Sequence, residues 1–154
     1  MTGKFKDYTN SKFASIAMLF AAVFMAVLIT AMFDIDIFYA FVGSAAIYAA
    51  ARILLARGSF TAYGDKVFFR LGFMQYVYSY SQILSAETKT GIFNGRLVQP
   101  YIVISIKLTD GNTVNFYDES LHKNALSTPE KCMELHENHQ FTKLSNYINE
   151  RAGR

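Results

Sequence analysis

The 154-residue sequence is poor in the residues that define several classes of protein. It has one cysteine, Cys132, which excludes an internal disulfide framework and is compatible with a reducing compartment. Two prolines and nine glycines exclude collagen-like repeats, and a net charge of +3 gives no reason to expect a nucleic-acid partner. Charged residues make up only 18% of the chain, whereas hydrophobic residues make up 52%. The hydrophobic excess lies almost entirely between residues 13 and 55.

Two apolar stretches dominate this region. Residues 13–33 carry no charge and, as a helix of about 31 Å, match a hydrocarbon core of about 30 Å. Residues 37–55 are interrupted only by Arg52, which lies close enough to the end to extend toward lipid headgroups. We therefore predict a transmembrane helical hairpin, with residues 34–36 as its turn and residues 1–12 as an N-terminal segment. A cleaved signal peptide is the alternative for the first span, but its apolar core is shorter and is not followed at once by another span.

Basic residues flank the hairpin only where it begins and ends, at Lys4, Lys6, Lys12, Arg52 and Arg57. The turn carries Asp34 and Asp36 instead. The positive-inside rule therefore predicts that both termini are cytoplasmic and that the turn is external. No ionisable residue lies in the middle of either span, so a proton relay, ion channel or transporter core is not expected.

Small residues recur four positions apart along both spans, which lets helix backbones approach closely. Under one interpretation the two helices pack only on each other. Under the other, a face that includes Gly43, Ala46 and Ala50 receives a helix of a membrane-protein partner or of a second copy.

Beyond residue 57 the apolar residues alternate, as is typical of β-strands. The clearest hairpin surrounds Asp110-Gly111. Val67, Phe69, Leu71 and Phe73 are expected on one face of a strand. In order, we expect strands over 60–63, 66–73 and 75–84, a strand or bend over 85–90, a loop over 91–100, and the hairpin over 101–117.

The C-terminal part has helical signals. Phe141, Leu144 and Ile148 form an apolar stripe that can cover a sheet, and Pro129 suits a first helical turn. One helix over 129–150 and two helices with a break over 137–140 are both compatible with this pattern.

Several segments resemble bacterial membrane proteins that carry a pleckstrin-homology-like (PH-like) domain after a two-helix anchor. The matching segments are Tyr63–Phe69, Tyr78–Ile83 and Ile104–Phe116. The resemblance implies an α+β domain over residues 58–154, in which an antiparallel PH-like sheet or barrel is closed by a C-terminal amphipathic helix. It also implies the bacterial inner (plasma) membrane and a role in protein–protein interaction or assembly. Phosphoinositide binding is not implied, because only Lys66 and Arg70 lie near the first hairpin, close to Asp65.

Three groups of residues are candidates for a functional site. Cys132, His136 and His139 are spaced so that a continuous helix would place all three on one face, as zinc ligands or as an incidental solvated surface. Asp118-Glu119 is expected to cap a turn. Tyr76, Tyr78 and Tyr80 either stabilise a sheet by packing or, if exposed, form a protein-contact surface. The sequence contains neither a glycine-rich phosphate loop nor a nucleophile elbow.

These patterns predict a non-enzymatic, membrane-anchored interaction or assembly module without a cofactor. Its expected partners are the lipid bilayer and a membrane protein or a second copy of the chain, with no nucleic acid. The alternatives are an accessory subunit of a larger membrane complex and a small metal-binding sensor or enzyme that uses Cys132, His136 and His139.

Overall fold

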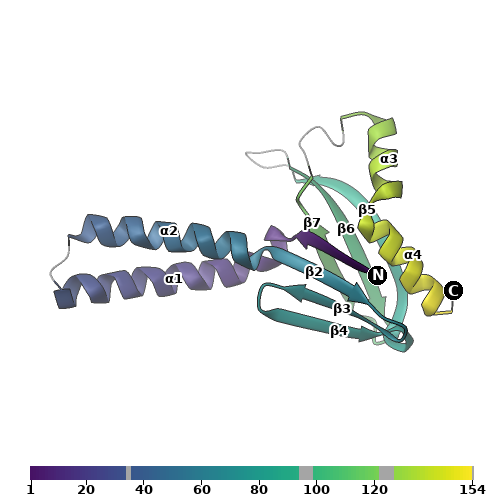
Figure 1. The fold of residues 1–154 in the computed structure, drawn as a ribbon, viewed down its shortest axis with the longest axis horizontal. Coiled ribbons are helices and arrows are strands. Elements are labelled where there is room, and N and C mark those ends of the chain that lie inside the picture. Colours follow the sequence, from purple (N-terminus) through teal and green to yellow (C-terminus); the bar gives the residue numbers. More distant parts are fainter. Residues whose placement is uncertain (34–35, 94–98, 122–126, 154) are drawn as a thin grey trace.

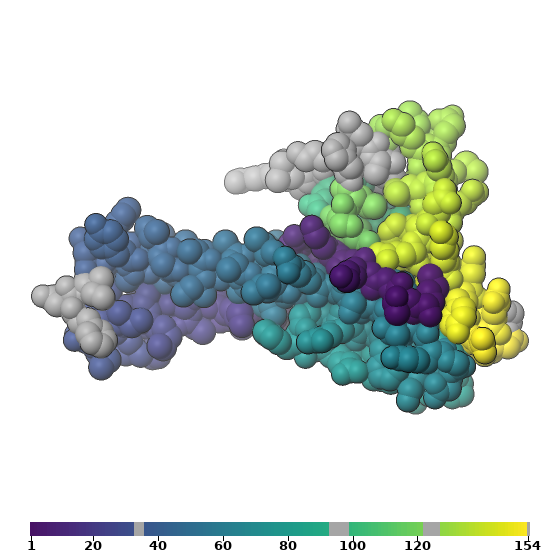
Figure 2. Space-filling view, viewed as in Figure 1, coloured from purple at the N-terminus to yellow at the C-terminus, as the bar shows by residue number. Residues whose placement is uncertain are grey.

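The structure is a computed structural model and describes residues 1–33, 36–93, 99–121 and 127–153. A pair of long antiparallel helices extends from a domain of strands and two short helices (Figure 1). The space-filling view shows the helix pair as an arm that protrudes from the rest of the molecule (Figure 2). In chain order the described elements are β1 (Thr2–Lys6), α1 (Tyr8–Phe33), α2 (Ile37–Leu55), β2 (Arg57–Ala62), β3 (Lys66–Leu71), β4 (Met74–Ser79), a 3-10 turn (Tyr80–Gln82), β5 (Ile83–Phe93), β6 (Gln99–Leu108), β7 (Thr113–Asp118), α3 (Pro129–Asn138) and α4 (Gln140–Arg151).

The first residues of the chain form a strand of the folded domain. β1 pairs with β2 in antiparallel register, from Thr2 opposite Thr61 to Lys6 opposite Arg57. The helix pair is therefore inserted between two neighbouring strands, whereas we had expected residues 1–12 to precede the domain as a separate segment. Only Phe5 marks the buried face of this short strand, and one apolar residue is too little for alternation to predict it.

Helix α2 has the expected bounds, whereas α1 begins at Tyr8, earlier than the expected residue 13. Both are long and apolar enough to cross a membrane. Their large apolar side chains point outward: Phe13 is 83% exposed and Phe20 is 72% exposed. An exposed apolar surface of this kind marks a site of contact with a membrane or with another protein.

Small residues do face one another between α1 and α2. Ser44 is buried in the contact, and its hydroxyl lies 3.2 Å from the Ala22 carbonyl oxygen and 2.8 Å from that of Ala40. The Ser44–Ala22 contact joins the two helices, whereas the Ser44–Ala40 hydrogen bond lies within α2, so mutual packing accounts for Ala22 and Ser44.

The strands form two antiparallel sheets, with the orders β1-β2-β3-β4 and β5-β6-β7. The expectation of an α+β domain with antiparallel sheets is confirmed, but the sheets do not close into a barrel. The 3-10 turn separates β4 from β5. At the other edge, the Glu119 N–H donates to the Lys6 carbonyl oxygen at 2.8 Å, but carboxylates serve as the acceptors on either side of it. The Lys6 N–H donates to Asp118, and the Tyr117 N–H donates to Asp7.

Phenylalanines from both sheets and from α4 meet in the core. The Phe69 and Phe116 rings stack with centroids 4.0 Å apart, and the Phe5 ring lies 5.2 Å from that of Phe141. The predicted stripe on the C-terminal helix is confirmed, since its members are fully buried: Phe141, Leu144 and Ile148. Burial of these side chains holds α4 across the sheets.

The turns and strand ends of the two sheets agree with the sequence-based predictions only in part. The hairpin around Asp110-Gly111 is confirmed, with Gly111 at φ 89°. The expected loop over 91–100 is wrong at both ends, because β5 extends to Phe93 and β6 begins at Gln99; residues 94–98 lie outside the described part. Phe73, expected on the same strand face as Val67, Phe69 and Leu71, is instead outside the strand and 81% exposed, because the strand ends at Leu71 and the chain turns there.

The C-terminal region forms two helices. The break falls at His139, within the segment 137–140 that the sequence indicated. The His139 ring accepts a hydrogen bond from the Phe141 N–H at 3.1 Å and so caps α4.

We expect Phe141→Ala to lower the free energy of unfolding by about 3–5 kcal/mol, because it empties a buried site that joins α4 to both sheets. Chemical denaturation of the full chain in detergent, followed by near-ultraviolet circular dichroism of tyrosine, measures this loss. Phe73→Ala is the matched control, and its expected effect is within about 0.5 kcal/mol because that side chain is exposed. Equal losses for the two variants would contradict the assignment of Phe141 to the core.

Candidate functional site

Asp7 is a fully buried carboxylate where β1 leads into α1. One oxygen accepts the Asn10 N–H at 2.7 Å and caps the helix, and the other accepts the Tyr117 N–H at 2.9 Å. Burial raises the pKa of Asp7, and the hydrogen bonds from Tyr117 and Asn10 offset this only in part. A single side chain therefore joins the first turn of α1 to β7.

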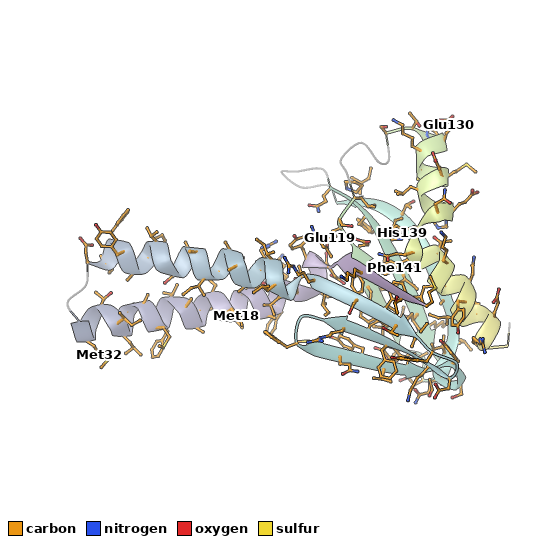
Figure 3. The ribbon with its side chains drawn as sticks, viewed as in Figure 1. Met18, Met32, Glu119, Glu130, His139 and Phe141 are labelled. Carbon is orange, nitrogen blue, oxygen red and sulfur yellow. The ribbon has the colours of Figure 1, made fainter. Side chains whose placement is uncertain are left out.

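Asp118 and Glu119, at the end of β7, make the reciprocal connection. Glu119 accepts the N–H and the hydroxyl of Thr9, each at 2.8 Å. Asp118 accepts the Lys6 N–H at 3.3 Å and the Ser120 N–H at 3.0 Å. The predicted role of Asp118 as a turn cap is therefore confirmed, and Figure 3 shows Glu119 at the base of the helix pair.

His139 extends this network to the C-terminal helices (Figure 3). Its Nε2 lies 3.3 Å from an Asp118 oxygen, while its Nδ1 accepts the Phe141 N–H. These partners assign the proton to Nε2. Burial would raise the pKa of Asp118, but hydrogen bonds from His139, Ser120 and Lys6 outweigh it and lower the pKa.

The arrangement of Ser120, His139 and Asp118 is not that of a nucleophile with its base. The Ser120 hydroxyl donates to Asp118 at 2.6 Å rather than to His139. Both ring nitrogens of His139 are engaged, so neither is free to accept a proton from a substrate. The cluster acts as a structural joint between the helix pair, β7 and α4.

Cys132, His136 and His139 do not share a helix face, because the helix ends at Asn138. The Cys132 sulfur lies 3.5 Å from the Thr90 hydroxyl, and the His136 Nε2 lies 3.2 Å from the Thr88 hydroxyl. Among the described residues, no group of three or more His, Cys, Asp or Glu side chains is placed to hold a metal ion.

The three tyrosines lie toward the core. Tyr76 and Tyr78 are half-buried against it, and the Tyr76 ring meets Phe116 at 5.5 Å between centroids. Tyr80 is 5% exposed, and its hydroxyl donates to the Tyr63 carbonyl at 2.8 Å. Burial raises the pKa of Tyr80 to about 12. The packing interpretation accounts for these contacts, and a contact role for these tyrosines stays a prediction.

The residues proposed for helix contact are exposed on α2. Because successive residues turn by about 100° around a helix, Gly43, Ala46 and Ala50 share one flank, away from Ser44. Gly43 has open space where a Cβ would lie. An apolar hollow of about 320 Å³ lies beside it, between α1 and α2.

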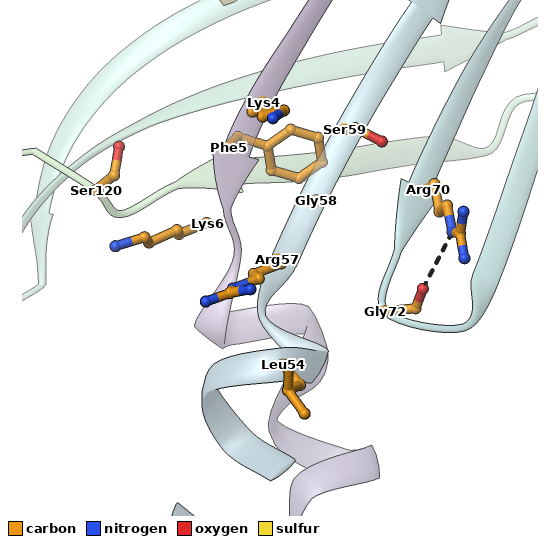
Figure 4. Close-up of a pocket in the computed structure, with 10 residues that line it drawn as sticks. All are labelled: Lys4, Phe5, Lys6, Leu54, Arg57, Gly58, Ser59, Arg70, Gly72 and Ser120. Carbon is orange, nitrogen blue, oxygen red and sulfur yellow. Dashed lines mark hydrogen bonds between the residues drawn. The ribbon is translucent and has the colours of Figure 1, made fainter. Parts of the chain in front are cut away.

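A second hollow lies where the strands meet the helix pair, and we call it the basic hollow (Figure 4). It measures about 550 Å³. Its polar walls come from β1, β2, β3 and the turn after β7, and its lower edge comes from the last turn of α2. Its lining residues are Lys4, Phe5, Lys6, Leu54, Arg57, Gly58, Ser59, Arg70, Gly72 and Ser120.

Sequence reasoning missed Asp7 and the grouping of cations in the basic hollow. An aspartate directly before a long apolar helix is a common N-cap, so local sequence carried a signal for Asp7. The grouping of Lys4, Lys6, Arg57 and Arg70 depends on strand pairing across the helix pair, which no local pattern indicates.

We expect Asp7→Ala to lower the free energy of unfolding by about 2–4 kcal/mol, since it removes a helix cap and also the carboxylate that accepts the partly buried Tyr117 N–H. Denaturation in detergent measures the change. Asp36→Ala, which removes the exposed cap of α2, is the control and should cost about 1 kcal/mol or less. If Asp7→Ala lowers the free energy of unfolding no more than Asp36→Ala does, Asp7 does not join α1 to β7 as described.

The lowered pKa of Asp118 predicts how the stability of the fold depends on pH. Its folded-state pKa lies below the unfolded value of 3.8, so its contribution to stability is complete above that value and is lost as the pH falls through the folded pKa. The difference in unfolding free energy between the wild type and Asp118→Asn should therefore be constant above about pH 5 and shrink below about pH 4. A difference that grows on acidification would contradict this sign.

Comparison of the chain with protein-family models, curated proteins and solved structures finds no match. The fold shares a set of elements with the architecture expected from the sequence. These are two apolar helices, antiparallel strands and a C-terminal helix that packs on the sheets.

Proposed function

We propose that the chain is a non-enzymatic, membrane-anchored interaction module that presents a PH-like domain at the cytoplasmic face of the bacterial inner membrane. The observation that carries the proposal is the pair of exposed apolar helices, held against the domain by Asp7, Asp118 and Glu119. Anchoring raises the concentration of the domain at the membrane, so that weak contacts with membrane partners become effective.

The charge distribution supports the proposed orientation. Lys6 and Arg57 lie where the strands meet the helices, whereas Asp36 lies at the opposite end of the pair. Cytoplasmic termini place the basic residues at the inner surface, as the positive-inside rule requires.

Cysteine accessibility tests this topology in the full chain. In a Cys132→Ala background, Asp36→Cys should react with a membrane-impermeant maleimide in intact spheroplasts. Met133→Cys, on the 64% exposed position of α3, should react only after the membrane is permeabilised. Labelling of Met133→Cys in intact spheroplasts, or recovery of the chain in the soluble fraction, would overturn the proposal.

The hollow beside Gly43 supports the accessory-subunit alternative, because a partner helix could fill it. If so, Gly43→Leu should abolish co-purification of a stoichiometric membrane partner or second copy in mild detergent. Ala45→Leu, about 160° around the helix from Gly43, is the matched control and should leave the native mass unchanged. Equal native masses for the wild type and Gly43→Leu would exclude this flank as the contact.

A further inference from the structure

We propose that the basic hollow binds the phosphate-bearing headgroup of an anionic phospholipid. The proposal rests on the membrane anchoring proposed above, which places the hollow at the inner surface of the bilayer.

The pairing of strands concentrates positive charge on one sheet. None of the four strands β1, β2, β3 and β4 contains an aspartate or glutamate, although together they carry five cations. Four of the five line the hollow: Lys4, Lys6, Arg57 and Arg70. The other sheet, in contrast, mixes both signs of charge.

The register brings these cations close together. Lys6 lies directly opposite Arg57, and two residues along, on the same face of the sheet, Lys4 and Arg70 both lie opposite Ser59. Like charges directly opposite one another destabilise a sheet. A bound anion would convert this unfavourable arrangement into a favourable one.

The cations have no carboxylate partner within the described part of the chain. None of the four has a side-chain nitrogen within 4.0 Å of a carboxylate oxygen there. Asp118, the carboxylate that binds the Lys6 backbone, is 2% exposed and also accepts hydrogen bonds from Ser120 and His139. It is therefore not available to neutralise the lysine side chains.

The position of the hollow favours a lipid as the source of the anion. Figure 4 shows Lys6 and Arg57 extending in the same direction, with Leu54 beneath them on the last turn of α2. Leu54 is 55% exposed and belongs to the apolar helix. Cations directly above an apolar surface match a phosphate directly above its acyl chains.

Native mass spectrometry of the full chain, released from nanodiscs, tests the proposal. The probes are phosphatidylglycerol and phosphatidylcholine in equal amounts. We expect the wild type to retain one phosphatidylglycerol in preference to phosphatidylcholine. Lys6→Gln with Arg57→Gln should lower that retention at least tenfold, whereas Lys107→Gln with Lys131→Gln, which removes the same charge outside the hollow, should not.

Two further double variants separate the loss of lipid binding from misfolding. Lys6→Arg with Arg57→Lys should keep the retention, and Lys4→Gln with Arg70→Gln should lower it, so that misfolding of one variant does not decide the outcome. Equal retention of the two lipids, or equal losses in the hollow and control variants, would overturn the proposal. Displacement of the lipid by millimolar inorganic phosphate would overturn the lipid as the source and assign a soluble phosphate compound instead.

The test is independent of the topology experiment. Retention in nanodiscs together with a wrong orientation in spheroplasts would refute the proposed function and leave the hollow as a phosphate site. The correct orientation in spheroplasts without selective retention of phosphatidylglycerol would refute only the proposal that the basic hollow binds an anionic lipid.

Discussion

Buried carboxylates that accept backbone N–H groups are the interactions on which this structure depends. Asp7 binds the N–H of Tyr117, Asp118 binds that of Lys6, and Glu119 binds that of Thr9. A buried carboxylate is costly unless it is hydrogen-bonded, and a buried N–H is costly without an acceptor. Each hydrogen bond therefore offsets the cost of burying both of its partners. Together these bonds fix the direction of the helix pair relative to the sheets.

The same interactions limit backbone pairing between the two sheets at this edge. The Glu119 N–H donates to the Lys6 carbonyl oxygen, but carboxylate oxygens accept from the Lys6 and Tyr117 N–H groups, so no continuous ladder joins β1 to β7. The His139 ring binds Asp118 and caps α4, so the closing helix is tied to the same point. The basic hollow forms beside this joint because β1 is held at the edge of the four-stranded sheet.

Much of the fold was predictable because its signals are local. Two uninterrupted apolar stretches predicted the helices, Asp110-Gly111 predicted a hairpin, and Phe141, Leu144 and Ile148 predicted the buried face of α4. The extent of β5 was not predictable, since it depends on pairing with β6 rather than on its own composition. Phe73 continued an alternating pattern that the turn at Gly72, with φ 56°, interrupts.

The candidate site was less predictable than the fold. Asp118 carried a local signal as a turn cap, but its contacts with Lys6 and His139 join segments far apart in the chain. The four cations of the hollow were individually visible in the sequence, and three of them, Lys4, Lys6 and Arg57, served to predict orientation. Their grouping requires the pairing of β1 with β2, which depends on the Phe5 side chain entering a core built almost entirely from later residues.

The insertion of the helix pair between β1 and β2 also constrains the order of assembly. During synthesis β1 emerges first, yet its partner strand follows only after both helices have been made. Phe5 has no core to enter until β2, β3, β7 and α4 exist. The domain therefore completes its fold only after both helices have been made and the chain has returned to the end of the helix pair at which β1 lies. A chain whose helices fail to pair keeps an unpaired edge on β2, so completion of the four-stranded sheet depends on a correctly formed helix pair.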